Sequence, residues 1–186
     1  METTVFVAGS GGHGIQNLGK TLVQAALLNG REVTCYPRYG IEKRGGYSSC
    51  YLVFSDEEIG NVKKEKSDVV IVIDQRAFNM FAGTVKPGGY LILAGAGRDH
   101  LMGLKQALYD RTYQNEERAD LPEGMREISR ETVREEITVS GGEHVRALFS
   151  MTPYYWRTSG ADRKKLDGLK LLVTPIDVQV LTYRKD

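Results

Sequence analysis

The stretch Thr4-Val-Phe-Val-Ala-Gly-Ser-Gly-Gly-His-Gly14 decides the fold, because it joins a short apolar run to a glycine-rich turn. The apolar run is rich in β-forming residues and stops at Gly9, which is typical of a buried strand in a parallel sheet. After Gly14, apolar residues recur at helical spacing as far as Leu27, and Asn29-Gly30 follows as a helix stop. A strand, a turn and a helix in this order predict an α/β fold.

The same rhythm continues along the chain. A turn is expected at residues 86–89, and apolar segments predict further strands at residues 32–36, 47–54, 69–73 and 90–93. We therefore predict a single doubly wound, Rossmann-like and mostly parallel sheet with helices on both faces. Residues 171–183 predict an antiparallel C-terminal strand or hairpin. The length of 186 residues fits one domain over 1–186, in which the charged, apolar-poor segment 111–134 is expected to be flexible or a lid.

Composition excludes several classes of protein. Lys and Arg number 25 and Asp and Glu 24, so the net charge of +1 gives no global field for nucleic acid or an anionic membrane. The two cysteines, Cys35 and Cys50, are too few for an iron–sulfur cluster and do not form a secreted disulfide framework. No apolar run approaches the roughly 18 residues of a membrane span. We expect a reduced, cytoplasmic protein without a metal site.

The first candidate site is the turn after the first strand, with the residues Gly9, Gly11, Gly12, His13 and Gly14. Glycines let a backbone approach a phosphate closely, and the N-terminus of the following helix attracts anions. The acid that a dinucleotide site expects about 20 residues further on is missing, because Cys35, Tyr36 and Pro37 stand there. Two alternatives stay open: a structural turn that binds nothing, and an exposed His13 with no contact to a phosphate or carboxylate.

The second candidate site is the polar segment Tyr39-Gly40-Ile41-Glu42-Lys43-Arg44-Gly45-Gly46. Arg44 carries a planar guanidinium suited to phosphate or carboxylate, and Glu42 could orient it. Gly45 and Gly46 allow close backbone approach. Loops at the carboxyl ends of strands meet at one crevice, so we expect this loop to face the first turn. A surface hairpin with a local ion pair is the alternative.

Taken together, these motifs over about residues 3–95 resemble the gamma subunit of 2-oxoacid:ferredoxin or flavodoxin oxidoreductases. The sequence departs from the family pattern where His13 replaces the usual Gln and Ile41 the usual Pro. The resemblance implies an accessory subunit that handles coenzyme A, with alpha, beta and delta-type partner subunits that hold thiamine diphosphate and iron–sulfur clusters. It carries over a binding role to Gly11, Gly12, Gly14, Glu42, Arg44, Gly45 and Gly46. No catalytic residue is assigned, and homo-oligomerisation stays open.

The second half, over about residues 85–186, resembles the C-terminal half of class I, S-adenosylmethionine-dependent ribosomal-RNA guanine methyltransferases. Its main motif is Met151-Thr-Pro-Tyr-Tyr-Trp-Arg157. Trp156 could stack on an RNA base, but we favour a role as a core anchor. The resemblance implies a junction of two family fragments near residues 85–97. The alternatives are therefore a methyltransferase-like domain that binds S-adenosylmethionine and RNA, and a chimeric or designed fold without activity.

Overall fold

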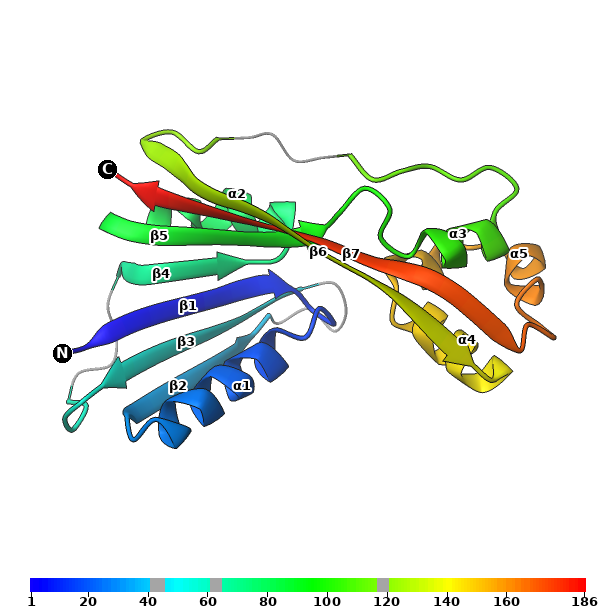
Figure 1. Cartoon of the computed structure of the whole chain (residues 1–186). Helices are drawn as coiled ribbons and strands as arrows, with labels where there is room; N and C mark the ends of the chain where they lie inside the picture. Colours follow the sequence, from blue (N-terminus) through cyan, green and yellow to red (C-terminus); the bar gives the residue numbers. More distant parts are fainter. Residues whose placement is uncertain (41–45, 61–64, 117–120) are drawn as a thin grey trace. The chain divides into compact units, whose positions relative to one another are not determined.

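The computed structural model describes residues 1–40, 46–60, 65–116 and 121–186. Its strands are β1 (Thr3–Ser10), β2 (Glu32–Tyr39), β3 (Tyr47–Ser55), β4 (Ser67–Val72), β5 (Val85–Ala96), β6 (Met125–Ser140) and β7 (Leu171–Lys185). Its helices are α1 (Ile15–Leu28), α2 (Gln75–Phe81), α3 (Met102–Leu108), α4 (Gly142–Ser150) and α5 (Gly160–Lys164), with 3₁₀ turns η1 (Ala82–Thr84) and η2 (Pro153–Trp156). Within the described ranges, the strands form a sheet with the order β2-β3-β1-β4-β5-β7-β6 (Figure 1).

The residues of the chain group into two compact units, and the expected single domain stays a prediction. The first unit comprises Met1–Gly95, Asp120–Glu131 and Val180–Asp186, and the second comprises Ala96–Ala119 and Thr132–Gln179. The first unit contains both candidate glycine turns, so it carries the candidate site.

The expected α/β sheet is confirmed, and part of it is parallel. β1 pairs in parallel with β4, and β4 in parallel with β5. β3, however, runs antiparallel to both β1 and β2. The connection between β2 and β3 is too short for the crossover of a dozen or more residues that parallel strands need, so these strands form a hairpin. The expected antiparallel C-terminal strand is β7, whose arrow runs opposite to that of β5 (Figure 1).

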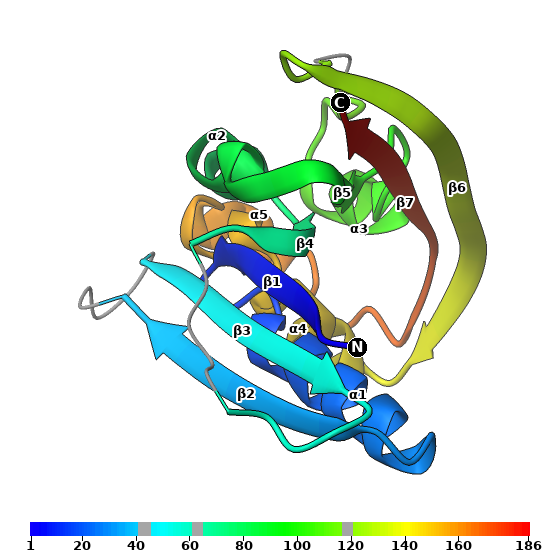
Figure 2. The ribbon, with the colours of Figure 1, turned by 90° about the vertical axis from the view of Figure 1, so that its left-hand side faces the viewer.

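Helices cover both faces of the first unit's sheet, as the sequence predicts. Alternate residues of a strand point to opposite faces. In β1, Val5 and Val7 pack in one apolar cluster with Ile15 of α1. The neighbouring Ala8 packs in another cluster with Phe78 of α2. α1 and α2 therefore lie on opposite sides of the sheet (Figure 2).

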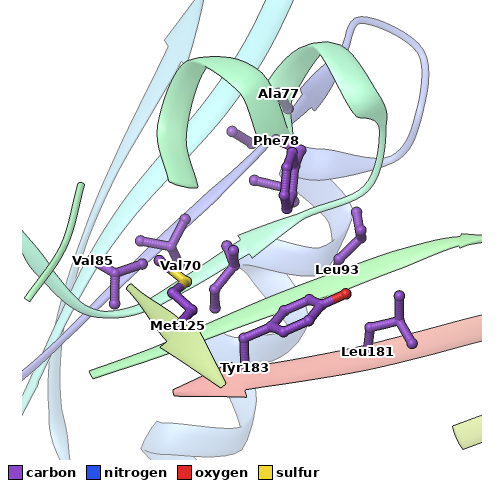
Figure 3. Packing of buried hydrophobic residues seen from close by; sticks show 11 residues of the cluster. Val70, Ala77, Phe78, Val85, Leu93, Met125, Leu181 and Tyr183 are labelled. Atoms are coloured by element: carbon purple, nitrogen blue, oxygen red, sulfur yellow. The ribbon is translucent and has the colours of Figure 1, made fainter. Parts of the chain in front are cut away.

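The apolar cluster beneath α2 includes residues from distant parts of the sequence. Figure 3 shows Met125, Leu181 and Tyr183 beside Val70 and Leu93. The large Tyr183 side chain is 1% exposed. Burying a side chain of this size stabilises a fold by roughly 2–3 kcal/mol relative to its exposure. The start of β6 and the end of β7 are therefore part of the first unit.

The turn expected at residues 86–89 is a bulge within β5. Ser67 pairs with Val85 while Val69 pairs with Tyr90, so β5 holds extra residues opposite β4. A Cβ added at Gly89 would lie 2.7 Å from the carbonyl oxygen of Asp68. Gly89 therefore allows a close approach of two backbones within the strand.

The second unit has an apolar core of its own. Lys105 of α3 is 0% exposed there, and its ammonium donates hydrogen bonds to the Tyr113 carbonyl and the Asn115 side-chain oxygen. Its Nζ also lies 4.5 Å from the centre of the Tyr113 ring. The core itself combines α3, α4 and residues near α5, with the buried side chains Leu101, Leu104, Leu108, Val145, Phe149, Leu166 and Leu172.

Two expectations for the second half differ from the structure. Residues 125–134 of the expected flexible segment belong to strand β6, whereas residues 117–120 lie outside the described residues. The expectation that Trp156 anchors the core is wrong, because this residue is 68% exposed. Tyr155 takes the inner position, with its ring centre 5.3 Å from that of Phe149. Its ring also contacts Trp156 edge-on at 4.9 Å, so Tyr155 separates the indole from the core.

Candidate functional site at two glycine-rich turns

The turn between β1 and α1 exposes main chain without covering side chains. Gly12 and Gly14 have φ of 92° and 77°, a region that only glycine adopts without strain. A Cβ added at either position would meet nothing within 4 Å, so the space in front of the turn is open. Gly14 caps α1, and no side chain supplies a cap hydrogen bond. Main-chain amides at such a helix start are suited to an anion.

Glycine is required at position 9 for a different physical reason than at Gly12 and Gly14. A Cβ at Gly9 would lie 2.5 Å from Cγ1 of Ile73 and 2.8 Å from Cδ1 of Ile15. Such distances require the neighbouring side chains to move. Packing between β1, α1 and the end of β4 therefore explains Gly9, whatever the turn binds.

The two glycine-rich turns are in direct contact, as the sequence predicts. The Gly11 amide donates a hydrogen bond of 2.7 Å to the carbonyl of Gly46. A Cβ at Gly11 would lie 3.2 Å from the same oxygen. On the other side of the hairpin, the Gly40 amide donates to the Tyr47 carbonyl at 2.9 Å. The ends of β2 and β3 therefore hold Gly46 against the first turn.

The remaining candidates of the second loop divide into two groups. Tyr39 ends β2 and is 72% exposed. Glu42, Arg44 and Gly45 lie outside the described residues. Their expected roles therefore stay predictions.

Asp74 fixes the first turn to α2. Its Oδ1 accepts the Ala77 amide at 2.8 Å and caps α2, while its Oδ2 accepts the Ser10 amide at 2.5 Å. Burial alone would raise the pKa of Asp74, but hydrogen bonds from His13, Ala77 and Ser10 outweigh it and hold the pKa well below its usual range. Asp74 is therefore a carboxylate whose charge is already satisfied by the protein.

His13 contacts a carboxylate, and that carboxylate belongs to the protein. Its Nδ1 lies 3.4 Å from Oδ2 of Asp74, and its side chain is 36% exposed. The contact holds the imidazole near the N-terminus of α2, which Asp74 caps. The ring is still accessible enough to contact a ligand in front of Gly12.

Gln16 is a site residue that sequence reasoning missed. Its side-chain amide donates hydrogen bonds to the Ser48 hydroxyl at 2.8 Å and the Ser49 carbonyl at 3.0 Å. These bonds fix the first turn of α1 to β3. The adjacent serines in an otherwise apolar strand were the only signal in the sequence, and it does not identify the partner.

Within the part of the chain that the structure describes, no group of three or more His, Cys, Asp or Glu could hold a metal ion. Among those same residues, no helix is long and apolar enough to cross a membrane.

Comparison with known proteins gives a family match over most of the chain. The family model described as pyruvate ferredoxin/flavodoxin oxidoreductase matches residues 4–146. The match runs through residues 85–97, so one family covers both sides of the expected junction with a methyltransferase-like half. The family match thus supports the resemblance to the oxidoreductase gamma subunit. It gives no support to the resemblance to a methyltransferase.

Curated relatives match about half of the chain. The ketoisovalerate oxidoreductase subunit VorA of Methanothermobacter marburgensis is 42% identical over 98 residues, which are 53% of this chain and 20% of that protein. The 2-oxoglutarate synthase subunit KorC of Methanocaldococcus jannaschii is 34% identical over 94 residues, which are 50% of each protein. The chain therefore spans half or less of the length of these relatives.

Two solved structures overlay on about half of the chain. The keto/oxoacid ferredoxin oxidoreductase gamma subunit of Geobacter sulfurreducens gives a TM-score of 0.43 at 24% identity and covers 50% of each chain. The 2-oxoglutarate:ferredoxin oxidoreductase of Magnetococcus marinus gives 0.44 at 27% identity, over 47% of this chain and 15% of that one.

Proposed function

Because the chain belongs to the pyruvate ferredoxin/flavodoxin oxidoreductase family, we propose that it is the gamma-type unit of a 2-oxoacid oxidoreductase complex. Its relatives act on different 2-oxoacids, so the identity of the 2-oxoacid is not part of the proposal. The unit works as an accessory part that binds a ligand and contacts partner subunits.

The proposed ligand is a phosphate-bearing cofactor of the coenzyme A class, bound at the two glycine turns. The observation that carries this proposal is the contact between Gly11 and Gly46, which holds the end of the second loop against the first turn. The open space before Gly12 and Gly14 admits a phosphate close to the backbone. Arg44 supplies the guanidinium that a phosphate would need beyond these amides.

The chain's own residues would bind and orient this ligand and not change its redox state. The start of α1 would hold the phosphate through main-chain amides, with His13 beside them. Asp74 keeps the turn in place, and hydrogen bonds from His13, Ala77 and Ser10 stabilise its carboxylate. When bound, coenzyme A would accept the acyl group that the complex produces.

Redox centres are proposed to reside in other subunits. An iron–sulfur cluster needs about four thiolates, and the chain has two cysteines. Alpha, beta and delta-type partners would hold thiamine diphosphate and the clusters. The mass of the native assembly would give its subunit composition and would show whether this chain forms a homo-oligomer.

Isothermal titration of the chain with coenzyme A tests the ligand. We expect coenzyme A to give binding heat, and we expect its affinity to fall at least tenfold in Arg44→Ala. The control is Arg126→Ala, which should change the affinity only slightly. The guanidinium of Arg126 faces the Asp186 carboxylate at 4.0 Å. S-adenosylmethionine serves as the second ligand and should give no heat. Absence of heat with coenzyme A, or equal affinities in the two variants, contradicts the proposal.

Isolation of the chain from its own host tests the partners. Native mass spectrometry should find it in a complex with larger subunits that reduces an electron acceptor with a 2-oxoacid and coenzyme A. Pyruvate, 2-oxoisovalerate and 2-oxoglutarate form the substrate panel. A chain that is found only by itself, with full activity in the depleted extract, contradicts the assignment.

A further inference from the structure

Cys35 and Cys50 bring their sulfur atoms together on neighbouring strands. Cys35 of β2 pairs with Leu52, and Cys50 of β3 pairs with Pro37. Because the two cysteines are diagonal neighbours with the same parity, their side chains lie on the same face of the sheet. Their Sγ atoms are 3.0 Å apart, a direct contact.

The two thiols differ in access. Cys50 is 0% exposed, and Cys35 is half-buried. Gly19 of α1 lies directly over Cys50, since a Cβ there would be 2.8 Å from its sulfur. Burial, together with the Cys35 thiol, raises the pKa of Cys50 to about 12. A reagent from solution therefore meets Cys35 first.

We propose that Cys35 and Cys50 are a redox-active dithiol that closes to an intrachain disulfide when a small-molecule disulfide is the oxidant. The contact at 3.0 Å needs only a small closure to reach the sulfur–sulfur bond length of about 2.05 Å. The two sulfurs share one strand pair, so a modest change of side-chain torsion can supply the movement. This inference goes beyond the proposed function and does not depend on it.

The reaction proceeds by two thiol–disulfide exchanges. The Cys35 thiolate attacks one sulfur of the oxidant, breaks its S–S bond and releases one thiol of the reagent. Cys50, after loss of its proton, then attacks Cys35 of this mixed disulfide and releases the second thiol. The two protein sulfurs are oxidised by two electrons in total, and one oxidant disulfide is reduced to two thiols.

The position of the pair gives the disulfide a structural consequence. The ring closed between Cys35 and Cys50 contains the hairpin end, where the Gly40 amide bonds to Tyr47 and the carbonyl of Gly46 accepts from Gly11. Oxidation would therefore restrain the hairpin that carries the second glycine turn. The oxidised chain should unfold at a higher temperature than the reduced chain.

Equilibration of the full chain with oxidised and reduced glutathione at a series of ratios tests the proposal. Free thiols are then trapped in denaturant with N-ethylmaleimide, and the intact mass is measured. We expect both thiols to disappear together, with a mass loss of two hydrogen atoms and no lasting glutathione adduct. Peptide mapping should find one linked peptide containing Cys35 and Cys50.

Two single variants separate closure from simple modification. Cys50→Ala should accumulate a glutathione adduct at Cys35, and Cys35→Ser should leave Cys50 unmodified while the chain is folded. Neither variant should gain thermal stability on oxidation. The proposal is overturned if wild-type chain keeps both thiols at every ratio, or if it stops at a glutathione adduct. The decisive measurement uses the wild-type chain, so the proposal can be refuted even if one of the variants fails to fold.

Discussion

The Ser10 amide and the Asp74 carboxylate are joined by a hydrogen bond of 2.5 Å, which ties the end of β1 to the start of α2. The same carboxylate caps α2 through the Ala77 amide. One side chain therefore satisfies main-chain donors of two different elements. The hydrogen bond from Ala77 makes Asp74 the N-cap of α2.

Replacement of Asp74 should destabilise the fold by removing both acceptors. We expect Asp74→Ala to lower the free energy of unfolding by about 1–3 kcal/mol, because the cap is lost and the Ser10 amide loses its partner. Asp74→Asn keeps one oxygen acceptor and should lose less. Urea denaturation of the three proteins measures this order. A change in Asp74→Ala within about 0.5 kcal/mol, the usual scatter of surface substitutions, would contradict it.

Acid should remove the contribution of Asp74. Its folded pKa lies well below the ordinary aspartate value of 3.8, so the folded state favours the carboxylate. This stabilisation is complete above the unfolded pKa and is lost as pH falls below about 4, because the unfolded chain takes up the proton first. The stability difference between wild type and Asp74→Asn should therefore shrink from pH 7 to pH 3. A difference that is constant or grows with acid would refute the assignment.

Thr4 and Asp68 form a second carboxylate link between β1 and β4. The Thr4 amide and hydroxyl donate to Oδ2 of Asp68 at 2.8 and 2.6 Å, and the Asp68 amide donates back to the hydroxyl at 3.0 Å. Thr4→Val keeps the shape and removes the hydroxyl, so we expect a loss of about 1–3 kcal/mol. Chemical denaturation measures it. Thr34→Val in β2 is the matched control, and equal losses in the two variants would count against the link.

Local sequence patterns were enough to predict the first glycine-rich turn and its contact with the second loop. The glycines before Ile15 and the stop at Asn29-Gly30 specify a strand, a turn and a helix. The direction of β3 was also within reach, since residues 40–46 leave no room for a crossover. The expectation of a mostly parallel sheet gave this loop length too little weight.

Tertiary contacts were beyond the sequence. Nothing local to Gln16 indicates that its amide reaches Ser48, because the partner is set by how α1 lies on β3. Trp156 was expected inside because tryptophan is usually buried, yet Tyr155 takes the place next to Phe149. In both cases, tertiary packing decides which of several similar side chains makes the contact.

Gly19 should resist substitution because Cys50 occupies the space beside it. Alanine favours a helix over glycine by about 1 kcal/mol, but a Cβ at Gly19 would lie 2.8 Å from the Cys50 sulfur. We expect Gly19→Ala to destabilise the chain by about 1–2 kcal/mol net. In a Cys50→Ala background, the same change should be neutral or stabilising. A double-mutant cycle by urea denaturation measures the coupling, and an unchanged penalty in both backgrounds would rule out the contact.

Gly12 allows the conformational and the ligand-binding requirements of the turn to be separated. At φ of 92°, Gly12→Ala adds backbone strain of about 1–2 kcal/mol without a clash, because nothing lies within 4 Å of the new Cβ. Gly83→Ala is the control, since it has the same empty surroundings without a positive φ. It should leave stability within about 0.5 kcal/mol.

The affinity of the same two variants for coenzyme A tests the site more directly than their stability does. The methyl group of Gly12→Ala would occupy the open space in which a phosphate should approach the turn. We expect its affinity for coenzyme A to fall at least tenfold at a temperature where the variant is fully folded, and Gly83→Ala to bind as wild type does. If Gly12→Ala loses stability but binds normally, the turn needs glycine for its conformation alone, and the ligand must contact the protein elsewhere.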